Sequence, residues 1–99
     1  MKTERQTFMV KGAPATTIEV DTQVNAVYVR FKRAAVARTV ARPSSMMHLA
    51  VDLDSRGEVI GIEAVGIKEF SLSFILHKAS VKAPNVDVSR ARYVPAQLV

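Results

Sequence analysis

Hydrophobic and polar residues alternate along much of this chain, and this period of two limits the possible folds more than any other feature of the sequence. Successive side chains of a β-strand point to opposite faces of a sheet, so the alternation predicts half-buried strands. Polar links at 22–25 and 54–57 favour turns, and turns of this length join antiparallel neighbours. We therefore expect a β-meander whose strands cover residues 16–21, 26–32, 36–42 (the least regular), 46–54 and 58–65.

The period changes near residue 71. Ser71 is a suitable N-cap residue, and Phe70 is placed to pack on Ile75 as a hydrophobic staple. His77 and Lys78 lie near the other end, where positive charge is favourable for the helix dipole. We expect a short helix over 72–79, within a segment 70–80, that covers the apolar face of the sheet.

The length of 99 residues is that of a single domain. The predicted fold class is α+β: an antiparallel β-meander of about five to six strands with one short helix packed on one face. Residues 1–15 form an N-terminal arm or an extra strand at 7–10, residues 16–66 form the meander core, and 86–95 form a possible last strand. The residues expected to be buried together are Val29, Phe31, Leu49, Val51, Ile60 and Ile62, whereas Val59, Gly61 and Glu63 are expected to point outward.

Composition excludes several classes of protein. There is no cysteine, which excludes disulfide scaffolds, cysteine-based metal sites and thiol catalysis. No apolar run approaches the roughly 18 residues of a transmembrane helix, and residues 1–11 lack the apolar core of a signal peptide. We expect a cytoplasmic protein with no membrane association and no cofactor.

Charge is distributed unevenly. The chain has 14 Lys and Arg against nine Asp and Glu, a formal net charge of +5, and no acidic residue lies between Asp21 and Asp52. Such a basic stretch can attract nucleic acid or another anion, or it can be a solvated edge that discourages aggregation. We favour the second interpretation because no aromatic platform accompanies the basic residues. The candidate anion or nucleic-acid contacts are Lys32, Arg33, Arg38 and Arg42.

Two blocks resemble a known family. Residues 20–31 read Val-Asp-Thr-Gln-Val-Asn-Ala-Val-Tyr-Val-Arg-Phe, and residues 51–63 read Val-Asp-Leu-Asp-Ser-Arg-Gly-Glu-Val-Ile-Gly-Ile-Glu. They are similar to the Asp-Ala-Leu-Tyr-Ile-Arg-Leu and Asp-x-Asp-x-x-Gly-x-Val-Val-Gly-Ile-Glu blocks of domain-of-unknown-function family 2283. Asn25 departs from the family's usual Asp, and the chain beyond Phe70 is longer than in minimal members. The resemblance implies a bacterial protein with a small β-rich fold, no catalytic residues, and a protein partner of a toxin-like kind.

Motifs for metal binding or catalysis are incomplete. Residues 52–57 with Glu63 nearly match the spacing of a calcium loop, but Arg56 occupies a ligand position and the flanking segments are predicted strands rather than helices. No second His lies two or four residues from His48 to share a metal, and no serine has the Gly-x-Ser-x-Gly context of a nucleophile. We predict no metal site and no catalytic residue.

The polar face of the predicted sheet is the remaining candidate site. Its residues form either a binding surface or a set of cross-strand ion pairs and hydrogen bonds, and we expect Arg30 and Glu63 to meet as one such pair. Two functions follow: a protein-interaction module, expected to be a homodimer joined through its first or last strand, or a nucleic-acid-binding protein that uses residues 30–42. An enzyme is less favoured than either. The candidate binding residues of this face are Tyr28, Arg30, His48, Asp52 and Glu63.

Overall fold

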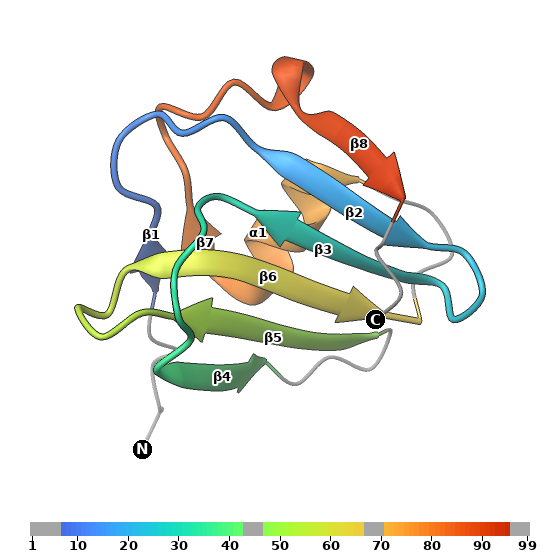
Figure 1. The fold of residues 1–99 in the computed structure, drawn as a ribbon, viewed down its shortest axis with the longest axis horizontal. Coiled ribbons are helices and arrows are strands. Elements are labelled where there is room, and N and C mark those ends of the chain that lie inside the picture. The colour runs from blue at the N-terminus through green and yellow to red at the C-terminus, as the bar shows by residue number, and fades with distance from the viewer. Residues whose placement is uncertain (1–6, 43–46, 67–70, 96–99) are drawn as a thin grey trace.

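The computed structural model describes residues 7–42, 47–66 and 71–95 (Figure 1). A six-stranded sheet has the order β4-β5-β6-β3-β2-β8, and a separate two-stranded sheet pairs β1 with β7. The α+β class and a largely antiparallel sheet with one short helix are confirmed. The elements are β1 (Phe8–Met9), β2 (Thr17–Asp21), β3 (Ala26–Arg30), β4 (Arg38–Arg42), β5 (His48–Leu53), β6 (Val59–Val65), α1 (Leu72–Ala79), β7 (Val81–Lys82), the 3₁₀ turn η1 (Val88–Arg90) and β8 (Arg92–Pro95).

The large sheet joins two antiparallel units side by side. One unit is the hairpin β2–β3 and the other is the meander β4–β5–β6, and they meet where β3 pairs with β6. The link between β3 and β4 leaves the sheet at Phe31, whose backbone N–H donates to the Ile60 carbonyl. It then carries the chain to the far edge of the sheet, so that β3 and β4 are not neighbours.

The turn and the helix form where the local sequence predicts them. Asp54 Oδ1 accepts the backbone N–H groups of Arg56 and Glu58, and Gly57 has a φ of +79°, which glycine adopts without strain. Ser71 Oγ accepts the N–H of Phe74 at 3.3 Å, which confirms the predicted N-cap, and α1 ends at Ala79 as predicted. The predicted staple involves Phe70, which lies outside the described residues.

The core lies between α1 and one face of the large sheet. Val29, Phe31, Leu49, Val51 and Ile62 belong to one buried cluster that includes Leu72 and Ile75 of the helix, and Ile60 is also fully buried. The prediction that these residues are buried together is confirmed for the five cluster members, whereas Ile60 is buried outside that cluster.

The prediction that Val59 points outward is wrong. The pairing of β5 with β6 shifts register between Asp52 and Leu53, so Val59 comes to lie opposite Leu53. A bulge of this kind places an extra residue in one strand and interrupts the alternation of its side chains. Val59 is therefore buried at 3% exposure within the core cluster.

Both ends of the described chain depart from a simple meander. The N-terminal strand β1 pairs in parallel with β7, a strand that the sequence pattern did not predict. The last strand is shorter than expected because η1 occupies its first part, and β8 pairs in parallel with β2 at the edge of the sheet.

Among the described residues, no helix has the length and apolar character needed to cross a membrane.

Candidate functional site

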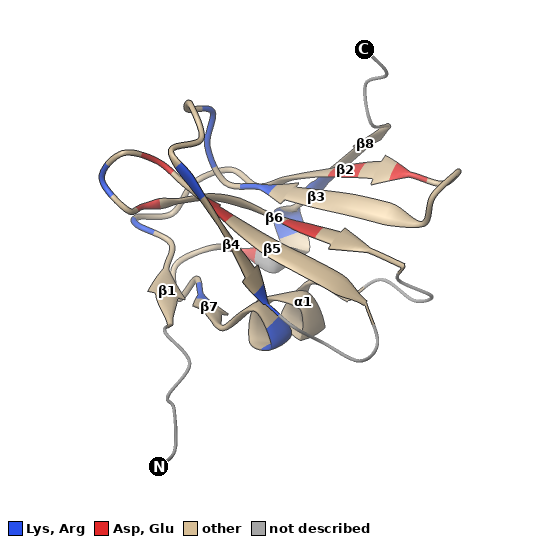
Figure 2. Ribbon diagram, turned by 90° about the horizontal axis from the view of Figure 1, so that it is seen from below, with Lys and Arg blue, Asp and Glu red and all other residues tan. Residues whose placement is uncertain are grey.

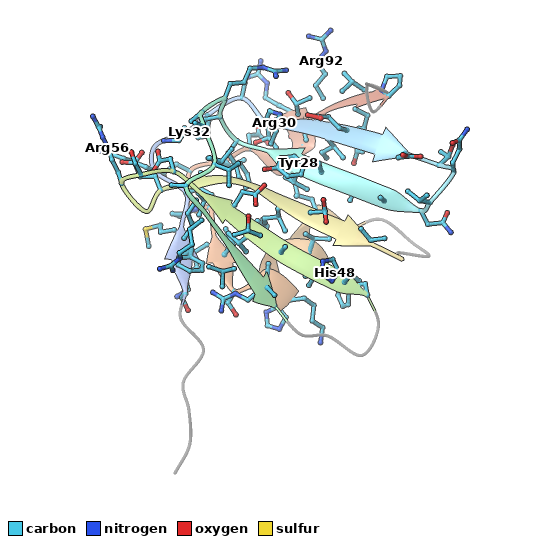
Figure 3. All side chains as sticks on the ribbon, turned by 60° about the horizontal axis from the view of Figure 1, so that its bottom comes forward. Tyr28, Arg30, Lys32, His48, Arg56 and Arg92 are labelled. Carbon is cyan, nitrogen blue, oxygen red and sulfur yellow. The ribbon has the colours of Figure 1, made fainter. Side chains whose placement is uncertain are left out.

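The candidate site lies on the outer face, which we define as the face of the six-stranded sheet opposite α1. Seen along the sheet, α1, β1 and β7 all lie on the other side (Figure 2). Within residues 7–42, 47–66 and 71–95, no strand or helix covers the outer face. The alternation of β3, β5 and β6 places all five predicted residues, Tyr28, Arg30, His48, Asp52 and Glu63, on this face (Figure 3).

Tyr28 is the centre of the best-connected part of the outer face. Its hydroxyl donates to Asp52 Oδ2 at 2.7 Å, and the hydroxyl of Thr39 donates to Asp52 Oδ1 at 2.7 Å. Burial raises the pKa of the Tyr28 phenol, and the hydrogen bond to Asp52 raises it further. The phenol therefore remains protonated over the physiological range and acts here as a fixed hydrogen-bond donor, not as a base.

Gly61 makes the position of the Tyr28 ring possible. A Cβ at residue 61 would lie 2.4 Å from Cε1 of Tyr28 and 2.6 Å from the backbone oxygen of Val29. A glycine inside a strand often marks the close approach of another group, and here the group is an aromatic ring that crosses from the neighbouring strand. The ring covers β6 and brings the Tyr28 hydroxyl to Asp52 on β5.

Arg30 also contacts the phenol ring. Its Cζ is 4.8 Å from the centroid of the Tyr28 ring, and its Nε donates to Glu19 Oε2 at 2.8 Å, with Nη2 at 3.4 Å from Oε1. The hydrogen bond to Glu19 raises the pKa of Arg30. The predicted Arg30–Glu63 ion pair is therefore wrong. Both carboxylates lie on strands next to β3, but the guanidinium that stacks on Tyr28 is bound by Glu19.

His48 and Glu63 form a second, weaker pair on the same face. His48 Nε2 lies 3.9 Å from Glu63 Oε1, and the two side chains are 62% and 51% exposed. Exposed pairs contribute about 0–1 kcal/mol, so this contact holds neither side chain firmly. The structure thus joins Tyr28, Arg30 and Asp52 into one network and leaves His48 and Glu63 outside it.

Sequence reasoning missed three members of this network. Glu19 and Thr39 occupy outward positions of their strands, so the same alternation could have selected them. Gly61 carries a signal of its own, because an isolated glycine in a strand pattern indicates a bulge or a close approach. The contacts that Glu19, Thr39 and Gly61 make each join different strands, so short-range spacing in the sequence does not determine them.

Of the four predicted basic contacts, two are bound within the protein and two are exposed. Lys32 donates to Asp54 and to Glu58, so its charge is neutralised within the protein. Arg42 is 6% exposed, its Nε donates to the Ala79 carbonyl at 3.0 Å, and its guanidinium lies 4.7 Å from the Phe8 ring centroid. The prediction of Arg42 as a surface contact is therefore wrong, because the side chain turns inward and binds the C-terminal end of α1. Arg33 and Arg38 are exposed.

Lys32, Asp54 and Glu58 tie the turn between β5 and β6 to the end of β3. The ammonium of Lys32 and, after it, the backbone N–H groups of Glu58 and Arg56 lower the pKa of Asp54 to about 2. Lys32 likewise lowers the pKa of Glu58, and both carboxylates raise the pKa of Lys32. These shifts stabilise the charged forms and identify the cluster as an ion-pair network.

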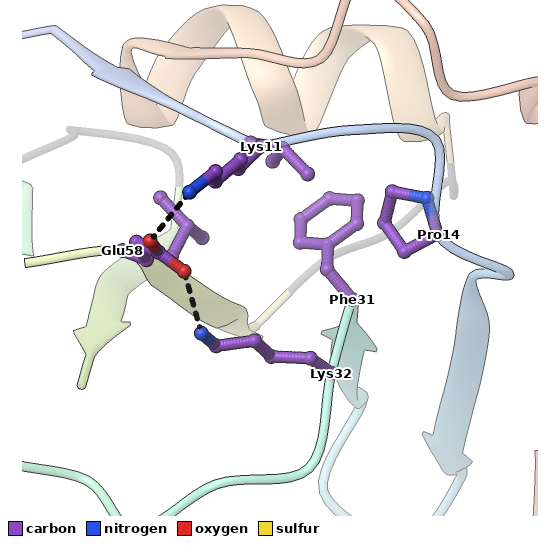
Figure 4. Close-up of a pocket in the computed structure, with 7 residues that line it drawn as sticks. Lys11, Pro14, Phe31, Lys32 and Glu58 are labelled. Carbon is purple, nitrogen blue, oxygen red and sulfur yellow. Dashed lines mark hydrogen bonds and ion pairs between the residues drawn. The ribbon is translucent and has the colours of Figure 1, made fainter. Parts of the chain in front are cut away.

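A small pocket lies beside this cluster (Figure 4). Glu58 is held between Lys32 and Lys11, whose Nζ lies 3.5 Å from Glu58 Oε2. The pocket has a volume of about 120 Å³, well below the roughly 300–1,000 Å³ typical of small-molecule sites. It is lined by Val10, Lys11, Pro14, Phe31, Lys32, Glu58 and Val59.

Comparison with known proteins adds no family to these observations. No family model matches the chain, and no curated protein or solved structure matches it. The two blocks that resemble domain-of-unknown-function family 2283 come together on the paired strands β3 and β6. Membership of that family stays a prediction.

Within the described residues, no group of three or more His, Asp or Glu side chains is arranged to hold a metal ion.

Proposed function

We propose that this protein is a small, non-catalytic protein-interaction module, and that its binding surface is the outer face around Tyr28. One observation carries the proposal: Tyr28 and Arg30 are stacked in fixed positions on a sheet face that no described element covers. Tyrosine and arginine are enriched among the residues that dominate binding energy at protein interfaces. We propose that this module acts in the bacterial cytoplasm, which agrees with the family that the two sequence blocks resemble.

The stacked arrangement lowers the cost of binding. The Tyr28 ring packs closely against Gly61 and contacts the guanidinium of Arg30, and its hydroxyl is held by Asp52. Immobilising a flexible side chain on association costs about 0.5–1.5 kcal/mol. Because the fold has already ordered both side chains, a partner that contacts them does not incur this cost again.

The charge of the outer face favours a partner with basic side chains. Electrostatic complementarity steers association and selects among partners. Four carboxylates and two guanidinium groups give this face a negative balance, although the whole chain carries +5. A toxin-like protein with a basic surface satisfies this requirement. The charged residues of the face are Glu19, Asp21, Asp52, Glu63, Arg30 and Arg92.

We also propose a homodimer joined at β8. This strand forms one edge of the large sheet, and an edge strand presents unpaired backbone groups to a second copy. The other predicted seam, β1, belongs to the separate two-stranded sheet with β7 and is not an edge of the large sheet.

A capture experiment tests the interaction module. The immobilised protein is exposed to an extract of its source cells, and the bound protein is identified and then titrated in purified form. Tyr28→Ala should weaken binding at least about 30-fold, the effect of a hot spot worth 2 kcal/mol. Tyr28→Phe, which keeps the ring, should retain most of the affinity, and Arg33→Ala, off this face, should retain all of it. Equal binding by Tyr28→Ala, with a native circular dichroism spectrum, would contradict the proposal.

A further inference from the structure

A second surface, distinct from the outer face, lies at the end of the molecule where β3 leaves the sheet. Three segments meet there: the stretch after β1, the link between β3 and β4, and the turn between β5 and β6. Glu58 lies within ion-pair distance of Lys32 and of Lys11, so one residue of each segment contributes to this contact. We call this surface the basic end, and its charged residues are Lys11, Lys32, Arg33, Arg38, Asp54, Arg56 and Glu58.

The basic end carries an excess of positive charge. Five cations and two carboxylates give it a net charge of +3, more than half of the +5 of the whole chain. Lys32 satisfies Asp54 and Glu58, and Lys11 reaches Glu58 only at 3.5 Å with 78% of its side chain exposed. Arg33, Arg38 and Arg56 are exposed and form no ion pair with another described residue.

Two of these arginines border one depression. Arg38 at the start of β4 and Arg56 in the turn between β5 and β6 both line an open hollow of about 510 Å³. Hydrogen bonds stabilise this turn, since Asp54 accepts two of its backbone N–H groups and the ammonium of Lys32. Figure 3 shows Arg56 and Lys32 at this end of the molecule, apart from His48 at the other end of the outer face.

We infer that the basic end binds the phosphate backbone of nucleic acid without reading its sequence. Lysine and arginine neutralise phosphates and release counterions, which supplies most of the affinity of such contacts. The residues that line the basic end include no exposed aromatic ring on which a base could stack, and stacking or base-edge contacts would be needed for preference among bases. Lys11, Arg33, Arg38 and Arg56 provide up to four phosphate contacts. Compared with the contacts predicted from the sequence, Lys11 and Arg56 take the places of the buried Arg42 and of Lys32, which binds Asp54 and Glu58.

Salt dependence provides a quantitative test. The whole protein is titrated against fluorescent 20-base-pair DNA duplexes of two unrelated sequences, and anisotropy is measured at 50 and 200 mM salt. Four phosphate contacts predict a slope of log affinity against log salt of about −3.6, which corresponds to an affinity loss of about 150-fold over this range. Both duplexes should bind equally.

Matched variants locate the surface. Arg38→Gln/Arg56→Gln should halve the slope, so that affinity falls only about 12-fold over the same salt range. Lys78→Gln/Arg90→Gln removes the same charge from α1 and η1, outside the basic end, the outer face and β8, and should keep the slope of the intact protein. Equal effects of the two variants would show that affinity follows net charge alone and would overturn the assignment. Binding to poly-glutamate with none to DNA would also overturn it.

Discussion

Replacing Gly61 by alanine tests the central packing of the outer face. The new Cβ would lie 2.4 Å from Cε1 and 2.6 Å from Cζ of Tyr28, and 2.6 Å from the Val29 carbonyl oxygen. The ring can rotate away, but the Val29 oxygen belongs to the paired backbone of β3 and cannot move without disturbing the sheet. We therefore expect both a displaced ring and a distorted strand pair.

The magnitude follows from the contacts that are lost. Overpacking costs about 1–3 kcal/mol. The hydrogen bond from Tyr28 to the charged Asp52 contributes about 1.5–3 kcal/mol, and the cation–π contact with Arg30 about 0.5–1 kcal/mol. Relative to glycine, alanine restricts the unfolded chain and so restores about 0.4–1 kcal/mol of folding stability. Since the ring relaxes in part, we expect a net loss of roughly 2–4 kcal/mol in the free energy of unfolding.

Urea denaturation followed by circular dichroism measures this loss, and a double-mutant cycle assigns its cause. In the background of Tyr28→Ala the ring is absent, so Gly61→Ala should cost at least about 1 kcal/mol less than in the intact protein. The residual cost reports the clash with the Val29 oxygen. A cost below about 0.5 kcal/mol in the intact protein, or equal costs in the two backgrounds, would refute this account of the glycine.

Three further predictions concern the core, the turn and the assembly. Ile62→Ala should lower the free energy of unfolding by roughly 2–5 kcal/mol, because Ile62 is fully buried; an unchanged urea midpoint would contradict its place in the core. Asp54 has a lowered pKa in the folded protein, so the stability it contributes is present above its ordinary value of 3.8 and is lost as the pH falls to about 2. Urea midpoints between pH 5 and 2 should therefore fall less steeply for Lys32→Met than for the intact protein, and parallel curves would refute the role of Lys32. Light scattering should give twice the 10.8 kDa of one chain at high concentration, and a constant monomer mass would remove the proposed dimer.

Several local features could be predicted from the sequence because short-range physics determines them. The N-cap at Ser71 and the turn at Gly57 depend on hydrogen bonds and backbone angles within a few residues. Alternation along β3 and β5 likewise assigns side chains to a face, because successive residues of any strand point to opposite sides. For this reason the residues of the candidate site were found on a common face.

The contacts of those residues were decided by tertiary structure. Alternation assigns a face but not a neighbouring strand, so it could not show that β3 pairs with β6 or that Tyr28 reaches across Gly61 to Asp52. A single bulge opposite Leu53 reversed the expected exposure of Val59. Arg42 is a charged residue on an edge strand, and its burial depends on the nearby end of α1, which follows it by 37 residues. Partners of this kind depend on pairings between distant segments, and the free energy of those pairings is settled only when the whole core assembles.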